Sequence, residues 1–144
     1  MTCDTVLYAF EGRLSVKWPY VILIVAYCGG IFWMSSQPRT PEFTRKFEHE
    51  DKLLHAAVFA GLACIVSMGT RYSNRRFSAR WQFWFPVIFA GLYGVSDEVH
   101  QAFVPHRYAA VDDVLADTAG ALFVQWLLCF RIWPRQATGG GDEG

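Results

Sequence analysis

Acidic residues at the ends of two long apolar runs constrain the fold more than any other feature of this sequence. The run from Phe83 to Val95 is followed at once by Asp97 and Glu98, and the next run begins at Val111 with further acids. A charged side chain is costly to place in the hydrocarbon of a bilayer, so such residues are functional candidates by default. We therefore expect the rest of the chain to shelter them from lipid.

The composition indicates a membrane protein of one domain. Hydrophobic residues make up 53% of the 144 residues, and they are concentrated in long runs. The formal net charge is zero, so no nucleic-acid partner is predicted. The cysteines form no C-x-x-C pair and no metal-ligand spacing, and we interpret them as small buried apolar residues. They are Cys3, Cys28, Cys64 and Cys129.

Four apolar runs are long enough to cross a bilayer. They predict an all-α fold, an integral membrane bundle of four transmembrane helices. The predicted spans are residues 18–34, 53–69, 81–103 and 111–130. The last two form a hairpin with its tip at residues 104–110. The predicted organisation is an N-terminal segment (1–17), a membrane domain (18–131) and a tail expected to be disordered (132–144).

The polar segment between the first two spans has two interpretations. Pro41 followed by Glu42 is typical of a helix start, and Phe43 and Phe47 lie one helical turn apart. These residues fit a short helix on the membrane surface. A solvated loop is the alternative.

The basic residues predict the orientation of the bundle. Alternate connecting segments lie on alternate sides of the membrane, and eight lysines and arginines fall on the side of the termini against five on the other. The positive-inside rule then places both termini in the cytoplasm. The eight are Arg13, Lys17, Arg71, Arg75, Arg76, Arg80, Arg131 and Arg135.

With this orientation, the polar residues of three spans meet in one layer on the outer side. Counted from the inner arginine of each span at about 1.5 Å per residue, each group lies roughly 21–26 Å along its helix. That is the outer third of a core about 30 Å thick. The candidate functional residues of this layer are Asp51, His55, Asp97, Glu98, His100, Gln101, Arg107, Asp113 and Asp117.

The spacing within the layer predicts which helix faces point inward. The pairs Asp51/His55, Asp97/Gln101 and Asp113/Asp117 each have i,i+4 spacing and so share a face. Small residues continue two of these faces, as expected for close helix packing. They are Ala90, Gly94 and Gly120. The stripes expected to face lipid contain Phe85, Phe89, Leu92, Phe123 and Leu127.

Several of these residues have purely structural interpretations. Asp51, Asp112, Asp113 and Asp117 could complement helix N-termini. His55 could bond Asp51 or a backbone carbonyl. Arg107 could pair with Asp97, Glu98 or Asp113 across the turn, as burial of several acids demands. His106 lies in an exposed turn and is given no role.

Three kinds of function remain open for the layer. Histidine and carboxylates are ligands for divalent cations, and His55, Glu98, His100, Asp113 and Asp117 include suitable ones. No metal motif accompanies them, so His55, Glu98 and His100 are only weak metal candidates. Carboxylates beside a histidine could also perform acid–base catalysis, whereas Ser96 is a poor candidate nucleophile. Binding of a polar head group without chemistry is the third. A layer that only fixes helix register is the structural alternative.

The sequence resembles the VanZ-like family of bacterial integral membrane proteins over roughly residues 20–130. The matching pieces are Ser35-Ser36-Gln37-Pro38, Asp51-Lys52-Leu53-Leu54-His55, the stretch from Asp97 to Arg107, and Asp113-Val114-Leu115-Ala116-Asp117-Thr118-x-Gly120. Two positions depart from the family pattern. His106 stands where the family often has Gly, and Asp117 stands where it often has Asn.

The resemblance implies a multi-pass protein of the bacterial cytoplasmic membrane with an outer-face polar motif. The founding member of the family gives low-level resistance to the glycopeptide teicoplanin, which implies a link to envelope antibiotics but no particular reaction or cofactor. Our leading expectation is a protein that binds a lipid-linked or cell-wall-related ligand in the outer leaflet. The alternative is an intramembrane enzyme, metal-dependent or acid–base, acting on a lipid or cell-wall precursor.

Overall fold

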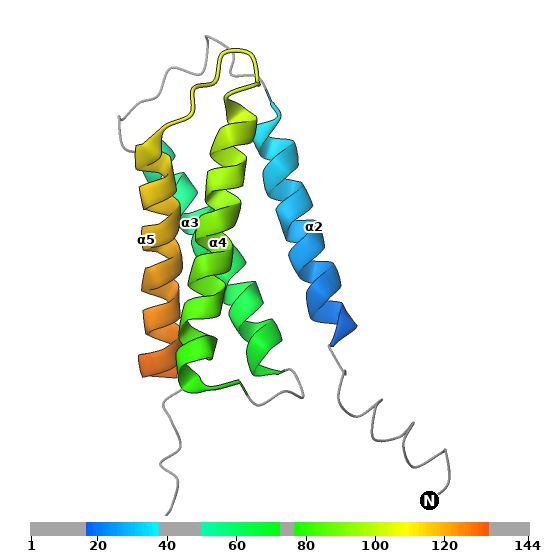
Figure 1. Ribbon diagram of the computed structural model, residues 1–144, viewed down its shortest axis with the longest axis vertical. Coiled ribbons are helices and arrows are strands. Elements are labelled where there is room, and N and C mark those ends of the chain that lie inside the picture. The colour runs from blue at the N-terminus through cyan, green and yellow to red at the C-terminus, as the bar shows by residue number, and fades with distance from the viewer. Residues whose placement is uncertain (1–16, 38–49, 73–76, 133–144) are drawn as a thin grey trace, which may run out of the picture.

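The computed structural model describes residues 17–37, 50–72 and 77–132, and within them the chain is helical. The helices are α2 (Trp18–Ser35), α3 (Glu50–Arg71), α4 (Ala79–Gln101) and α5 (Val111–Leu127), and α5 continues as the π-helix η1 (Leu128–Ile132). Figure 1 shows them side by side in one bundle. The predicted surface helix at residues 41–47 lies outside the described residues, and so does the predicted disordered tail (132–144) apart from Ile132, which ends η1.

Three helices of the described segments are long and apolar enough to cross a membrane. They are Trp18–Ser35, Lys52–Arg71 and Val111–Ile132. These agree closely with the first, second and fourth predicted spans. Helix α4 has 23 residues, which suffices to cross a bilayer, but its polar residues keep it out of this group. Its crossing therefore stays a prediction.

Helices α3 and α5 form the most extensive contact in the bundle, and glycine makes it possible. A Cβ atom at Gly120 would collide with the backbone carbonyl of Ala56, so the two helices touch backbone to backbone. A Cβ atom at Gly94 of α4 would lie 2.7 Å from Asp117 Oδ2 of α5. The predicted small-residue faces are therefore confirmed as sites of close approach.

The outward faces are largely as predicted, with two exceptions. Phe85, Leu92 and Phe123 are exposed, as lipid-facing side chains must be in a bundle without its bilayer. Phe89 packs against the apolar core, and Leu127 is only partly exposed. The core that Phe89 joins consists of Ile31, Phe59, Leu62, Ala63, Val66, Ala90 and Ala121.

Helix α2 lies at one side of the other three (Figure 1) and is attached differently. Tyr27 donates its hydroxyl to the Val58 carbonyl of α3 at 3.0 Å, and Tyr93 of α4 donates to the Cys28 carbonyl at 2.7 Å. A Cβ atom at Gly29 or Gly30 would meet nothing within 4 Å. Long side chains, rather than backbone contact, hold α2 in place. Cys28, Cys64 and Cys129 are partly buried.

Pro86 lies inside α4, and it is fully buried. Proline has no N–H, so the carbonyl of Gln82, four residues earlier, loses its helical partner. The side chain of Gln125 on α5 replaces that donor, with its Nε2 atom 2.7 Å from the Gln82 oxygen. Neighbouring helices commonly satisfy carbonyls freed by proline in this way.

Candidate functional site

The predicted polar residues gather at one end of the bundle, where α2 and α4 end and α3 and α5 begin (Figure 1). We call it the polar end. Five of its acidic and amide side chains are buried, although all are polar. They are Asp97, Glu98, Gln101, Asp113 and Asp117. Asp51 lies in the first turn of α3, but its side chain is outside the described part of the structure.

One group at this end joins α3, α4 and α5. His55 Nδ1 lies 3.1 Å from Asp117 Oδ1, and His55 Nε2 lies 3.9 Å from Asp113 Oδ2. The ligand atoms of His55, Glu98 and Asp113 all lie within 4.8 Å of one another. We call His55, Glu98, Asp113 and Asp117 the carboxylate–histidine cluster. Asp117, the residue that departs from the family's frequent Asn, is thus the partner of His55.

Two carboxylate oxygens of the cluster lack a hydrogen-bond partner among the described residues. The Ala110 N–H donates to Glu98 Oε2 at 2.8 Å, but Glu98 Oε1 has no donor. Asp117 Oδ2 also has none and faces Gly94. A buried polar atom without a partner carries a desolvation cost of about 1–3 kcal/mol, and more if it is charged. The cluster therefore has acceptor capacity to offer to a proton, a cation or a ligand.

A second group runs from the turn after α4 to the end of α2. Arg107 Nη1 donates to Gln101 Oε1 at 3.0 Å, and Gln101 Nε2 donates to Asp97 Oδ2 at 2.8 Å. Arg107 also donates to the carbonyls of Met34, at 3.2 Å, and Gln37, at 3.1 Å. We call Arg107, Gln101 and Asp97 the arginine–amide–carboxylate chain. Gln101 thus links Arg107 to Asp97, one of its three expected partners.

The bonds of Arg107 to α2 were not foreseen from the sequence. Carbonyls at a helix C-terminus have no helical donor, and a basic side chain suits them. Arg107 supplies donors to the last turn of α2. The Ser35-Ser36-Gln37-Pro38 piece of the family resemblance marks this helix end and was the available signal.

His100 lies apart from the cluster, against α2. Its Nε2 atom is 3.0 Å from Ser36 Oγ, and its ring stacks on Phe32 with centroids 4.3 Å apart. The group with metal-ligand spacing contains Asp113 in its place. Of the residues that the sequence offered as metal ligands, His55, Glu98 and Asp113 belong to this group, and His100 does not.

Two further predicted residues have structural roles at the surface. Lys52 pairs with Asp112 at 2.8 Å, where both side chains are substantially exposed, and such pairs contribute little stability. His106 has φ of 62°, in the left-handed region. Glycine adopts that conformation without steric cost, which explains why the family often has glycine there.

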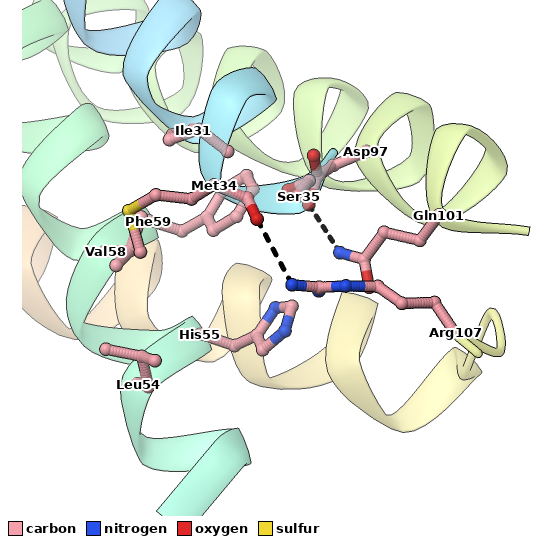
Figure 2. A pocket seen from close by; sticks show the side chains of 10 residues that line it. All are labelled: Ile31, Met34, Ser35, Leu54, His55, Val58, Phe59, Asp97, Gln101 and Arg107. Atoms are coloured by element: carbon pink, nitrogen blue, oxygen red, sulfur yellow. Dashed lines mark hydrogen bonds between the residues drawn. The ribbon is translucent and has the colours of Figure 1, made fainter. Parts of the chain in front are cut away.

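A pocket of about 90 Å³ opens beside these groups, between α2, α3 and α4. Figure 2 shows one wall formed by Ile31, Met34, Leu54, Val58 and Phe59, and a polar wall formed by Ser35, His55, Asp97, Gln101 and Arg107. A single water needs roughly 10–15 Å³ by a comparable measure, so the pocket has room for several waters or a small polar group. His55 belongs to both the pocket and the carboxylate–histidine cluster.

The family model of VanZ/LLP1 matches residues 18–133, which is most of the chain. The chain belongs to the VanZ/LLP1 family. No curated protein and no solved structure matches the chain. Family membership and the three apolar helices together indicate a membrane protein.

Proposed function

We propose that this VanZ/LLP1-family protein binds the polar head of an amphiphile, lipid-linked or related to the cell wall, in the outer leaflet of the bacterial cytoplasmic membrane. The observation that carries the proposal is the divided lining of the pocket, with five apolar side chains on one wall and five polar ones on the other. An amphiphile requires such a division, because its polar head needs hydrogen-bond partners in the protein to replace the water that it loses on burial.

The rim of the pocket supports entry from the bilayer. Met34 of α2 and Leu54 of α3 line the pocket, and they are 46% and 52% exposed. On helices of this apolarity, such side chains face hydrocarbon. The volume admits part of a head group, while the acyl or polyprenyl part stays outside along α2 and α3. His55, Gln101 and Asp97 offer donors and acceptors that suit hydroxyl and amide groups.

Filling the pocket tests this proposal. Purified protein in nanodiscs is incubated with a polyprenyl-diphosphate-linked glycopeptide, and bound lipid is counted by native mass spectrometry. Val58→Trp fills the apolar wall and should lower binding by about tenfold or more. Val99→Trp adds the same ring on the exposed face of α4, away from the pocket, and should bind as the parent does. Equal binding by both variants and the parent would contradict the proposal.

The orientation belongs to the same proposal and needs its own test. Both termini are in the cytoplasm if the arginine-rich segment between α3 and α4 faces inward. In a chain with its native cysteines replaced by alanine, Tyr108→Cys should react with a membrane-impermeant maleimide in intact cells. Ser78→Cys should react only after lysis. The reverse pattern would place the polar end inside the cell.

An intramembrane enzyme is the second candidate, favoured by the buried pair of His55 and Asp117. When Asp117 accepts from Nδ1, Nε2 is the nitrogen of a neutral imidazole that takes up a proton. Release of a water-soluble head group from the same lipid, abolished in His55→Gln and retained in His100→Gln, would establish catalysis. Binding without release would assign the site to recognition alone.

A further inference from the structure

We infer that His55, Glu98 and Asp113 form a binding site for one divalent transition-metal ion, with Zn²⁺ the best fit, and that Asp117 positions the histidine. This site goes beyond the proposed amphiphile pocket, and neither depends on the other. It selects His55, Glu98 and Asp113 from the ligands that the sequence offered, because His100 lies against α2.

The histidine is oriented as a metal ligand. With Asp117 Oδ1 at 3.1 Å from Nδ1, the proton of a neutral ring lies on Nδ1, and Nε2, the acceptor nitrogen of that tautomer, lies 3.9 Å from Asp113 Oδ2. A carboxylate behind a histidine is the usual second partner of metal-bound imidazole, since it fixes the tautomer and the ring orientation. Asp117 occupies that place, and it is fully buried.

The distance from Nε2 to Asp113 Oδ2 is close to that between two ligand atoms of one ion. Asp113 Oδ2 lies 3.9 Å from Nε2, which is too long for a hydrogen bond. Two ligand atoms bound to the same Zn²⁺ at about 2.0–2.2 Å lie roughly 3.4 Å apart in tetrahedral geometry. The ligand atoms of the three residues lie at most 4.8 Å apart. A movement of ~1.4 Å would bring even this pair to the tetrahedral distance, and rotation of a carboxylate side chain can supply it.

Glu98 provides an independent observation that points to a cation. Its side chain is 4% exposed, and Oε1 has no hydrogen-bond donor in the described part of the chain. The backbone N–H of Ala110 holds Oε2 and so fixes the side chain against the cluster. The lysine on the same helix turn as His55 bonds Asp112 at the surface instead. A divalent ion would satisfy Oε1 and offset the charge of the three carboxylates.

The donor set indicates the class of metal. One imidazole nitrogen and two carboxylate oxygens suit borderline ions such as Zn²⁺, Co²⁺ or Mn²⁺, whereas Ca²⁺ prefers six or more oxygens. Three protein ligands leave a fourth position of a tetrahedral ion open, as in catalytic rather than structural zinc sites.

The test uses the full chain in detergent, stripped with chelator and titrated with Zn²⁺ and separately with Co²⁺. The parent should bind about one equivalent of each ion, and Co²⁺ should give visible d–d absorption with nitrogen ligation. The Glu98→Gln/Asp113→Asn double variant should lose the equivalent. Asp117→Asn should lower affinity by about 10–100-fold, as removal of a second partner of the histidine does.

Two matched controls separate this site from non-specific binding. Asp112→Asn removes the adjacent, exposed acid, and His100→Gln removes the other histidine of the polar end, so both should bind as the parent does. Zn²⁺ should also raise the melting temperature of the parent but not that of the double variant. This shift on adding Zn²⁺ reports binding even if the double variant starts from a lower melting temperature. A parent without bound ion and without a melting shift, or a double variant with the parent's affinity, would overturn the inference.

Discussion

The carboxylate–histidine cluster and the arginine–amide–carboxylate chain lie at the same end of one bundle, yet they are completed to different degrees. In the chain, Arg107 donates to Gln101 and to two backbone carbonyls, and Gln101 donates to Asp97. In the cluster, Glu98 and Asp117 each keep a buried oxygen without a donor among the described residues. The first group is satisfied by the fold itself, and the second is not.

This difference shows which buried polar atoms hold the helices together and which can still bind another group. A buried polar group that the fold satisfies positions helices, because removing either partner exposes a desolvation cost. A buried polar atom that has no hydrogen-bond partner in the fold is stabilised when a ligand or ion binds to it. We therefore assign to the arginine–amide–carboxylate chain the attachment of α2 in addition to its place in the pocket wall, and to the cluster the greater capacity to bind a further ligand or metal. The following predictions test that assignment, from the largest expected effect to the smallest.

Gly120→Val should disrupt the cluster by separating α3 from α5. The added side chain would occupy the position of the Ala56 carbonyl, which is backbone and cannot move aside. We expect a loss of about 4 kcal/mol or more, measured as thermal or denaturant stability in detergent. Ala119→Val, next in the chain and exposed, is the control and should change stability little. Tolerance of Gly120→Val would contradict the backbone contact.

Arg107→Ala should detach α2 while leaving the cluster in place. It removes donors from Gln101 and from the Met34 and Gln37 carbonyls, and we expect a loss of about 2–3 kcal/mol. Arg107→Lys should recover only part of this, because an ammonium lacks the planar fork of donors. Metal affinity should be unchanged in both. Full recovery by lysine would show that charge alone is required.

Gly94→Ala should weaken the cluster without touching the chain. The added methyl lies 2.7 Å from Asp117 Oδ2 and 3.2 Å from Asp117 Cβ, so Asp117 must shift away from His55. A loss of about 1–3 kcal/mol is expected, together with weaker Zn²⁺ binding. Gly91→Ala is the matched control one helical turn earlier, where the nearest atom is Thr118 Oγ1 at an ordinary 3.4 Å. If Gly94→Ala and Gly91→Ala changed stability and Zn²⁺ binding equally, the close contact of Gly94 with Asp117 would not be what the cluster requires.

His106→Gly should stabilise the protein slightly. The turn that contains His106 supplies Arg107 to the chain and Ala110 N–H to the cluster, so it serves both. Glycine relieves the left-handed conformation, and a gain of about 1 kcal/mol in unfolding free energy is expected. His106→Ala keeps the Cβ atom and should give no gain. A gain with alanine would locate the cost in the imidazole rather than in the backbone.

Much of the fold could be predicted from the sequence because each helix is specified locally. Three spans agree with the apolar helices of the structure, and α2 ends in the Ser35-Ser36 pair as expected. The meeting of His55 with Asp117 follows from depth and from i,i+4 spacing, since both are set by helical rise alone.

Contacts that depend on the rotation of one helix against another could not be predicted. His100 and Asp97 are both on α4, but only their angular positions decide that one meets α2 and the other faces Gln101. Phe89 turned inward for the same reason. The donor that Gln125 supplies to α4 requires the register of two helices, which no sequence spacing encodes.

That glutamine has a consequence for the distant polar end. The orphaned carbonyl beside Pro86 occurs at one height on α4, so a single longitudinal alignment of α4 and α5 lets Gln125 reach it. If α5 moved along α4 by even one residue, the Gln82 carbonyl and the Gln125 amide would both be buried without this hydrogen bond. The same alignment brings Glu98 level with Asp113, roughly 18 Å further along α5. A substitution at the opposite end of the α4–α5 hairpin, such as Gln125→Leu, would thus displace Glu98 relative to Asp113 at the polar end.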